Sequence, residues 1–392
     1  MGFFNNSSVT NISVHPNVGY VNNSMTELYN QCSSFNGEVI IPHGVTDISY
    51  MLQACKAYNK ILNIPNSVTN MSRTFSGCSN FNLPIELPNS VTNISYMLAS
   101  ATTFNSHINI PNSVTDMSGM LRTTYAFNSP INIPNSVINM CGTFYSSNKF
   151  NQNVVIPNSV INISRCFDGA TVFNSIVTIG SSVIDMSMAF NNCPNFNKPI
   201  EIPSGVQYVN DCFYNCQKFN QPIVLRNTVI NSVNFMRECT GFNSTLTIED
   251  GVTNIAQTFV NFASFNKPII IPNSVVNMYN AFSTSKVVYF NQPITIGTNV
   301  VNMNNAFYGF LKNSVQNITI LSNHVNDVAR MMYGKNNSKR INVTIPRGGT
   351  TYTTFLTSTS TTSCVGASIT WTNDTNNNCF YNKTRNIYIY YV

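Results

Sequence analysis

The sequence predicts a repeat solenoid, because one short phrase recurs along most of its 392 residues. Prolines stand 23 residues apart from Pro42 to Pro157, and the same step continues, with other residues in some copies, to Pro272. Beyond Pro272 the step lengthens by one or two residues per copy, as far as Pro346. A fixed period of about 20 to 50 residues is typical of stacked structural repeats. We therefore expect about fourteen coils of 23–25 residues in residues 19–346.

Each coil carries its apolar residues at fixed positions, counted from the proline as position 0. Val fills position 3, Phe or Leu fills position 10 in most copies, and an aromatic residue fills position 16. Positions 20 and 22 are apolar around a variable residue, as in Ile85-Glu86-Leu87, which is the alternation of a strand with one buried face. One coil cannot bury this face, but stacked coils can. We expect a curved parallel sheet, with short helical turns at positions 7–13 on the opposite side.

Asparagine occupies position 17 in every copy from Asn36 to Asn291. We interpret this row as a structural ladder, in which each amide bonds backbone groups that a bent chain leaves unpaired inside the turn. A row of ligand-binding residues is the alternative, but a ligand does not require identical residues beside every buried aromatic ring. The predicted ladder includes Asn82, Asn105, Asn128, Asn151, Asn174, Asn197 and Asn220.

Position 21 points away from the buried side of the sheet, and position 19 flanks it. Both rows vary from copy to copy while the buried rows do not. This variation suits a ligand-binding face and equally suits a solvated sheet face, so both interpretations stay open. The candidate ligand-binding residues are Asn63, Glu86, His107, Asn109, Asn132, Thr178 and Glu201.

The two flanks differ from the repeats. Residues 1–18 hold apolar residues such as Phe3 and Phe4 that can cover the first coil as a cap. From Arg347 the composition changes, and residues 369–372 and 386–392 alternate like strands. We predict that residues 347–392 form a small β element that caps the last coil, folds as an appendix, or pairs between chains.

Six of the eleven cysteines fall at position 13, where Ala and Ser also occur. We interpret these cysteines as small buried fillers rather than as disulfide partners. Outside the repeats, Cys364 and Cys379 are the expected pair if any disulfide forms.

Composition narrows the function classes. The net charge is only +6, and the Lys and Arg residues are scattered, so we expect no nucleic-acid partner. No stretch of 18 apolar residues is present, so we expect no membrane insertion, and the first residues do not resemble a signal peptide. The acids and four histidines form no catalytic or metal-binding pattern. We expect no enzyme activity, no cofactor and no metal.

The repeats resemble a known family. The phrase Ile64-Pro-Asn-Ser-Val-Thr-Asn-Met-Ser72, followed by Phe75, Cys78 and Phe81-Asn82, is similar to BspA-type leucine-rich repeats of bacterial and protist surface proteins. Phe219-Asn-Gln-Pro-Ile223 also resembles the Phe-Asn-x-Pro repeats of mycoplasma-like, amoebal and viral proteins. The resemblance implies a leucine-rich-repeat solenoid and attachment to host cells, matrix or other microbes. It carries over no site residues.

From these observations we expect a non-enzymatic recognition or adhesion protein. Its expected partner is a host-surface protein or glycan, bound along the exposed face of the sheet. The expected location is a bacterial cell surface or a phage tail or fibre, since phage proteins also carry such repeats. The alternative is a structural or decoration component of a virion, contacting other virion proteins through residues 347–392.

Overall fold

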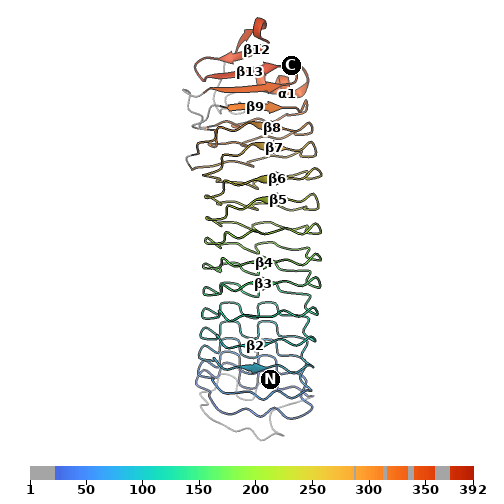
Figure 1. Ribbon diagram of the computed structural model, residues 1–392, viewed down its shortest axis with the longest axis vertical. Coiled ribbons are helices and arrows are strands. Elements are labelled where there is room, and N and C mark those ends of the chain that lie inside the picture. Colours follow the sequence, from blue (N-terminus) through green and yellow to red (C-terminus); the bar gives the residue numbers. More distant parts are fainter. Residues whose placement is uncertain (1–22, 287, 312–315, 334–339, 358–370) are drawn as a thin grey trace. The chain divides into compact units, whose positions relative to one another are not determined.

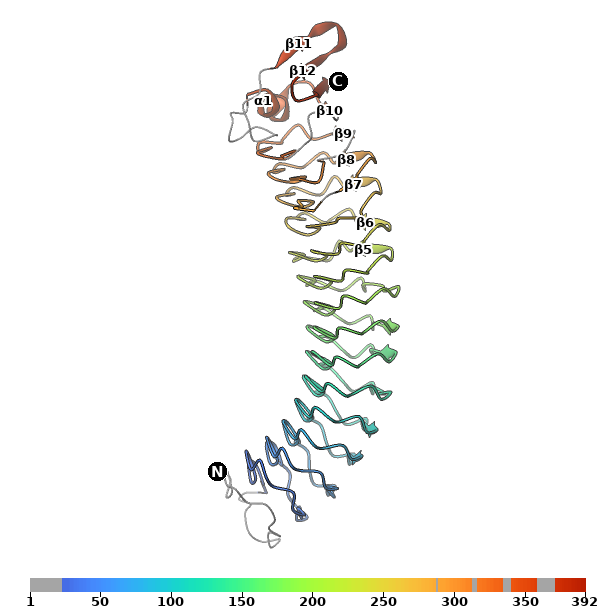
Figure 2. The same cartoon turned by 90° about the vertical axis from the view of Figure 1, so that its left-hand side faces the viewer.

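The computed structural model describes residues 23–286, 288–311, 316–333, 340–357 and 371–392 (Figure 1). The predicted cap, residues 1–18, and Cys364 lie outside these residues. The chain divides into two compact units, Met1–Lys198 and Pro199–Val392. Within each unit the coils are stacked in the order of the sequence, as the side view in Figure 2 shows. The predicted repeat solenoid is therefore confirmed in both units.

Short parallel strands lie on one side of the coils in the first unit. They are β1 (Ile85–Glu86), β2 (Ile108–Asn109), β3 (Val154–Val155) and β4 (Val177–Thr178). β1 pairs with β2 and β3 pairs with β4, both in parallel and between equivalent residues of successive coils. In each strand the first residue is buried and the second is exposed, as the alternation at positions 20 and 21 predicts.

The second unit continues the pattern with longer strands. β5 (Ile223–Leu225) pairs with β6 (Leu246–Ile248) in parallel. A seven-stranded sheet follows, with the order β11-β12-β13-β10-β9-β8-β7. Its parallel solenoid strands are β7 (Ile269–Ile271), β8 (Ile294–Ile296), β9 (Gln316–Ile320) and β10 (Ile341–Ile345).

The C-terminal segment is joined to this sheet. It consists of α1 (Gly349–Thr357), β11 (Thr372–Asp374), the single-turn helix η1 (Thr375–Asn377), β12 (Cys379–Asn382) and β13 (Ile387–Tyr391). β13 pairs with β10 in parallel, and β12 and β11 then add antiparallel strands. From α1, the Thr351 hydroxyl donates to the Ser322 carbonyl at 2.7 Å and accepts from the Val325 N–H at 2.9 Å. The segment thus covers the last described coil.

Consecutive tight turns form positions 7–13, opposite the sheet, where short helical turns were expected. The Met51 N–H donates to the Ile48 carbonyl at 3.2 Å and the Gln53 N–H to the Tyr50 carbonyl at 3.1 Å. The residues between them donate to the next coil, as the Tyr50 N–H does to the Ser72 carbonyl at 2.9 Å. An α-helix would use all these N–H groups along its own axis. Here alternate groups join coils instead, which is why no helix forms at these positions in the described coils.

Residues with positive φ recur in these turns, mainly at positions 8 and 12. At position 8, Tyr50, Arg73 and Tyr96 have φ of 58°, 57° and 54°. The Arg73 guanidinium carbon lies 4.3 Å from the centre of the Tyr96 ring and 5.6 Å from that of Tyr50, so the three side chains stack with cation–π contacts. Gly119 follows at this position, and a Cβ there would lie 2.5 Å from the Tyr96 ring. Gly142, one coil further, has no such neighbour, since the nearest atom would be 3.9 Å away.

One buried carboxylate, Asp168, also lies among the turns of the first unit. Its side chain lies 3.8 Å from Arg165 and forms hydrogen bonds with Asn191 and Asn192. Burial raises the pKa of Asp168 to about 6, although Arg165, the two amides and Arg122 act to lower it. This carboxyl group therefore titrates under mildly acidic conditions.

Stacked aromatic rings run through the core at position 16. In the first unit the rings of Phe81, Phe104, Phe127, Phe150 and Phe173 lie with successive centroids 5.8–6.0 Å apart and nearly parallel planes. All five side chains are at most 1% exposed. The coils are therefore joined both by backbone hydrogen bonds and by a continuous column of rings.

The position-13 residues fill a buried slot and also donate a hydrogen bond. The Cys78 thiol donates to the Leu52 carbonyl of the preceding coil at 3.1 Å, and the Cys55 thiol donates to the Tyr29 carbonyl at 3.0 Å. Ser147 and Thr124 occupy the same slot and donate equivalent bonds at 2.7 and 2.9 Å. The slot thus accepts a small side chain, and where that side chain is Cys, Ser or Thr a hydrogen bond to the preceding coil adds a polar role to the predicted packing role.

The position-17 asparagines connect successive coils. The Asn82 Oδ1 accepts the N–H of Asn105 at 2.8 Å, and the Asn128 Oδ1 accepts the N–H of Asn151 at 2.9 Å. Equivalent bonds of 2.7–2.8 Å join Asn105 to Asn128, Asn151 to Asn174, Asn174 to Asn197, and Asn220 to Asn243. These bonds run between coils, whereas bonds inside one turn were expected. The side chains lie at the surface rather than in the core.

Candidate binding surface

All seven candidate residues on the sheet side have exposed side chains. In the first unit, Glu86 lies on β1 opposite Asn109 on β2, and Thr178 lies on β4. Asn63 and Asn132 are exposed at position 21 of their own coils, His107 is exposed at position 19, two residues before Asn109, and Glu201 is exposed at position 21 in the second unit. The strand register therefore places Glu86 and Asn109 side by side on one face within the first unit.

The same face carries apolar side chains among the polar ones. Val155 on β3 is 66% exposed, and Ile61 and Ile176 at position 19 are 67% and 54% exposed. In the second unit Ile270 on β7 is 69% exposed. Exposed apolar residues beside amides and carboxylates give this face a mixed polar and apolar chemistry.

A groove of about 280 Å³ hollows this face in the second unit. Apolar walls are provided by Ile200, Pro222 and Val224, and Thr245 and Thr247 add two hydroxyl groups. Two charged residues, Glu201 and Arg226, also line the groove. Glu201, predicted from the sequence as a row member, is therefore part of a concave site.

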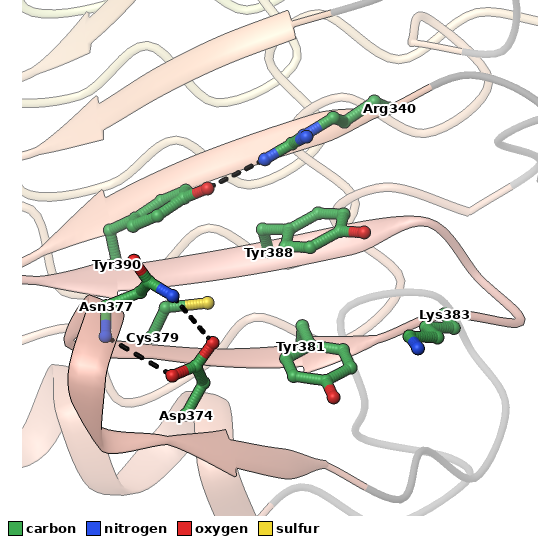
Figure 3. A pocket seen from close by; sticks show the side chains of 8 residues that line it. All are labelled: Arg340, Asp374, Asn377, Cys379, Tyr381, Lys383, Tyr388 and Tyr390. Carbon is green, nitrogen blue, oxygen red and sulfur yellow. Dashed lines mark hydrogen bonds between the residues drawn. The ribbon is translucent and has the colours of Figure 1, made fainter.

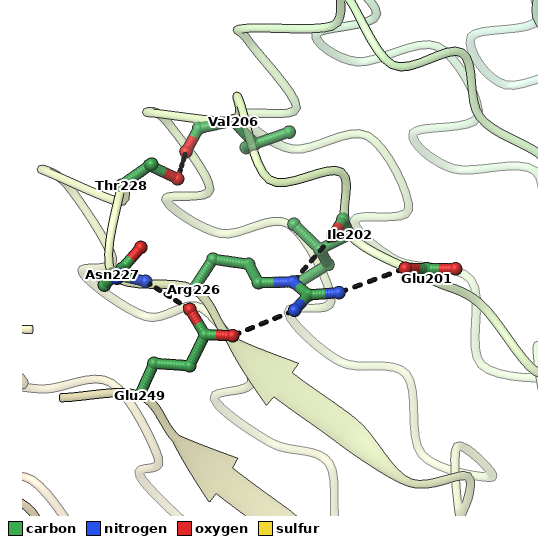
Figure 4. Close-up of polar contacts among 7 residues, drawn as sticks. All are labelled: Glu201, Ile202, Val206, Arg226, Asn227, Thr228 and Glu249. Atoms are coloured by element: carbon green, nitrogen blue, oxygen red, sulfur yellow. Dashed lines mark hydrogen bonds and ion pairs between the residues drawn. The ribbon is translucent and has the colours of Figure 1, made fainter.

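Arg226 is held at the groove by three partners, drawn in Figure 4. Its Nη2 donates to Glu201 Oε1 at 3.0 Å, its Nη1 to Glu249 Oε1 at 2.8 Å, and its Nε to the Ile202 carbonyl at 3.0 Å. The second Glu249 oxygen accepts the Asn227 N–H at 2.9 Å. This backbone bond, together with Arg226, lowers the pKa of Glu249.

The two carboxylates differ in how open they are. The Glu201 side chain is 84% exposed, whereas those of Arg226 and Glu249 are 23% and 29% exposed. A ligand can therefore reach Glu201 directly, while Glu249 mainly fixes the guanidinium. Sequence reasoning did not select Arg226 as a site residue. The sequence did contain a sign of this site, because Arg226 and Glu249 stand at position 0 of two successive coils, where most coils have proline.

Within the described residues, no group of three His, Cys, Asp or Glu side chains is arranged to hold a metal ion. The same residues contain no helix with the length and hydrophobicity needed to span a bilayer.

Comparison with known families identifies the repeats. The family model described as "Mycoplasma protein of unknown function, DUF285" matches residues 23–132, 69–177, 156–249 and 235–346, which together span most of the chain. The chain belongs to the DUF285 family. This membership confirms the resemblance to mycoplasma-type repeats and is consistent with BspA-type repeats. No curated protein matches the chain.

Two solved structures are similar to this DUF285 protein. A leucine-rich repeat protein from Bacteroides ovatus shares 18% identity over 66% of this chain and 79% of its own, with a TM-score of 0.38. A leucine rich cell surface protein from Faecalibacterium prausnitzii shares 14% identity over 91% of each chain, with a TM-score of 0.31.

Proposed function

We propose that this protein is a non-enzymatic recognition or adhesion protein that binds a host-surface protein or glycan through the exposed face of its sheet. The observation that carries the proposal is the contrast between two rows of each coil. Position 16 is filled by a buried ring from coil to coil, whereas position 21 changes among Asn, Glu, Thr, Val and Ile while remaining outside the core. Because packing does not determine which residue stands at position 21, the residues there are free to be selected for ligand binding.

The groove at Glu201 and Arg226 supports the same function. It combines an accessible carboxylate, two threonine hydroxyls and apolar walls within a small volume. Because Arg226 is fixed by Glu249 and the Ile202 carbonyl, its position is set before a ligand arrives. A preorganised site loses less entropy on binding than a mobile one.

The proposed location is outside the producing cell, on a bacterial surface or on a phage tail or fibre. Immunogold labelling of intact cells, together with mass spectrometry of purified particles released from them, separates these locations. Finding the chain only in the cell interior would contradict the proposal. If the chain is instead found in particles, and removing it blocks particle assembly but not attachment, a decoration role is favoured.

Binding is tested with a glycan array and with host cells, comparing wild type with surface variants. The first-unit variant carries Asn109→Ala and Asn132→Ala, and the second-unit variant carries Glu201→Gln and Arg226→Gln. We expect at least one of them to lose about tenfold or more in affinity with an unchanged fold by circular dichroism. Ser175→Ala, a change in the asparagine-ladder region, is a matched control. Unchanged binding by both variants would place the binding site elsewhere.

A further inference from the structure

A second cavity, of about 410 Å³, lies on the C-terminal β element of the second unit (Figure 3). Tyr381, Tyr388 and Tyr390 line it together with Asp374, Arg340 and Lys383. The volume is within the range of about 300–1,000 Å³ that is usual for small-molecule sites. None of these residues belongs to the sheet-face groove.

Strand pairing explains why the tyrosines meet. Tyr381 on β12 is opposite Tyr388 on β13, and Tyr390 follows Tyr388 on the same face of β13. The Tyr381 and Tyr388 rings lie 5.8 Å apart with planes 20° from parallel. Ile387 and Ile389, between and beside them, are buried, so the tyrosines must face outward. This alternation creates a wall of aromatic carbons that carries hydroxyl groups.

The sheet register also connects this wall to the exposed row of the solenoid. Thr344 on β10 is paired with Tyr390, and Asn342 is paired with Tyr388. The Asn342 amide donates to the Asn317 Oδ1 at 2.8 Å and its own Oδ1 accepts from the Arg340 Nε at 2.8 Å. The cavity is thus a continuation of the outward face of β9 and β10.

Two cations are placed beside the tyrosines. The Arg340 guanidinium carbon lies 3.9 Å from the centre of the Tyr388 ring, and its Nη2 donates to the Tyr390 hydroxyl at 2.7 Å. The Lys383 Nζ lies 5.8 Å from the centre of the Tyr381 ring. Since the Tyr390 oxygen accepts from Arg340, its own O–H remains able to donate.

The single carboxylate of the cavity is already bonded. Asp374 Oδ1 accepts the Asn377 N–H at 3.3 Å, and Oδ2 accepts from the Asn377 side-chain amide at 2.8 Å. Asp374 is the N-cap of η1, so it has a structural role in this turn. With two cations against one capped carboxylate, the lining has an excess of positive charge and of hydrogen-bond donors.

We propose that this cavity binds a sugar residue that carries a carboxylate. A pyranose ring has apolar C–H faces that fit aromatic walls, and oxygen-rich edges that fit the tyrosine, arginine and lysine donors. The carboxylate is the part that the excess positive charge selects, because charge-assisted bonds to Arg or Lys are stronger than neutral ones. This site is separate from the sheet-face groove and does not depend on it.

The test is isothermal titration of the full chain with 3′-sialyllactose and with trigalacturonic acid, using lactose as the neutral control. We expect one acidic probe to bind about tenfold or more tightly than lactose, with affinity falling as salt is raised. Arg340→Gln should remove this preference, and Tyr390→Phe, which keeps the ring, should weaken binding severalfold. Arg122→Gln, which changes an arginine on the turn side of the first unit outside both cavities, is the matched control and should leave this preference unchanged.

Three results would overturn the proposal. Lactose could bind as tightly as the acidic sugars, or neither acidic probe could bind at millimolar concentration. Alternatively, Arg340→Gln and Tyr390→Phe could both bind as wild type does while retaining the wild-type circular dichroism spectrum. If Arg340→Gln fails to fold, Tyr390→Phe decides, since it removes one oxygen and no apolar contact.

Discussion

Replacing Phe127 by alanine tests the aromatic column in the middle of the first unit. The ring is fully buried and lies 6.0 Å from the Phe104 ring and 5.8 Å from the Phe150 ring. The substitution removes one ring that two neighbouring coils both contact. The two ring pairs are each worth about 0.5–1.5 kcal/mol beyond their burial.

The expected loss of stability follows from burial plus the cavity left behind. A buried Phe→Ala change costs about 3–5 kcal/mol, because the burial of the ring is lost and a cavity is left behind. Phe127→Leu keeps most of the apolar volume but loses both ring pairs, so it should cost about 1–3 kcal/mol, less than the alanine change. Asn128→Ala loses bonds to Asn151 and Gln152 at the surface, where water can replace them, and should cost about 0.5–1.5 kcal/mol. Asn132 is exposed on the same coil, so Asn132→Ala should change the free energy of unfolding by no more than about 0.5 kcal/mol.

Urea unfolding ranks the four variants by their loss of stability. Hydrogen exchange shows which coils are destabilised, because coil arrays do not always unfold as one unit. Amides of the coils on either side of Phe127 should exchange faster in the alanine variant, with smaller changes in distant coils. The reasoning is refuted if Asn132→Ala destabilises as much as Phe127→Ala. That result would mean that the buried and exposed faces of the sheet have been exchanged.

Three further predictions concern the turn side and the core. Gly119→Ala should lower the urea midpoint more than Gly142→Ala does. Both residues have positive φ, which costs about 1–2 kcal/mol for alanine, but only at Gly119 would the new methyl group displace the Tyr96 ring. Equal losses would contradict this contact. The pKa of Asp168 is raised to about 6 in the folded state, so its protonated form contributes stability at about pH 4 that is lost as the pH rises through 6. The urea midpoint of the wild type should therefore fall over this pH range by more than that of Asp168→Asn. Equal falls in the two proteins would disprove a raised pKa. Burial raises the pKa of Cys78 well above its usual value, so Ellman's reagent should modify this thiol only after unfolding, and rapid modification of the folded chain would refute its burial.

The sequence was sufficient to predict the solenoid because its buried rows repeat with a fixed period. Each ring at position 16 must meet the rings above and below it, and only a constant spacing allows this. The exposure of Glu86 and Asn109 followed from the same alternation. Their involvement in binding stays a prediction, because exposure alone does not identify a ligand.

The turns and the two cavities were beyond the sequence for different reasons. Tyr50 and Arg73 are not residue types that indicate positive φ, and their conformation is imposed by hydrogen bonds to the next coil. The groove at Arg226 arises where a charged residue replaces the proline of position 0. Within the repeat pattern this replacement is only an irregularity, so the pattern did not indicate a site. The tyrosine cavity depends on the pairing of β13 with β10, and no periodic pattern encodes that pairing.

The way the stack ends has a consequence for assembly. Every coil offers its neighbour a ready set of backbone groups, so an uncovered last coil would accept the first coil of another molecule and grow into a fibre. β13 occupies those groups on β10, and the antiparallel strands beyond it finish in β11, which is only three residues long and carries exposed Thr372 and Asn373. A short, polar final strand is a poor template for further addition. The change from parallel to antiparallel pairing after β13 thus disfavours end-to-end stacking of further coils on the C-terminal end of the solenoid.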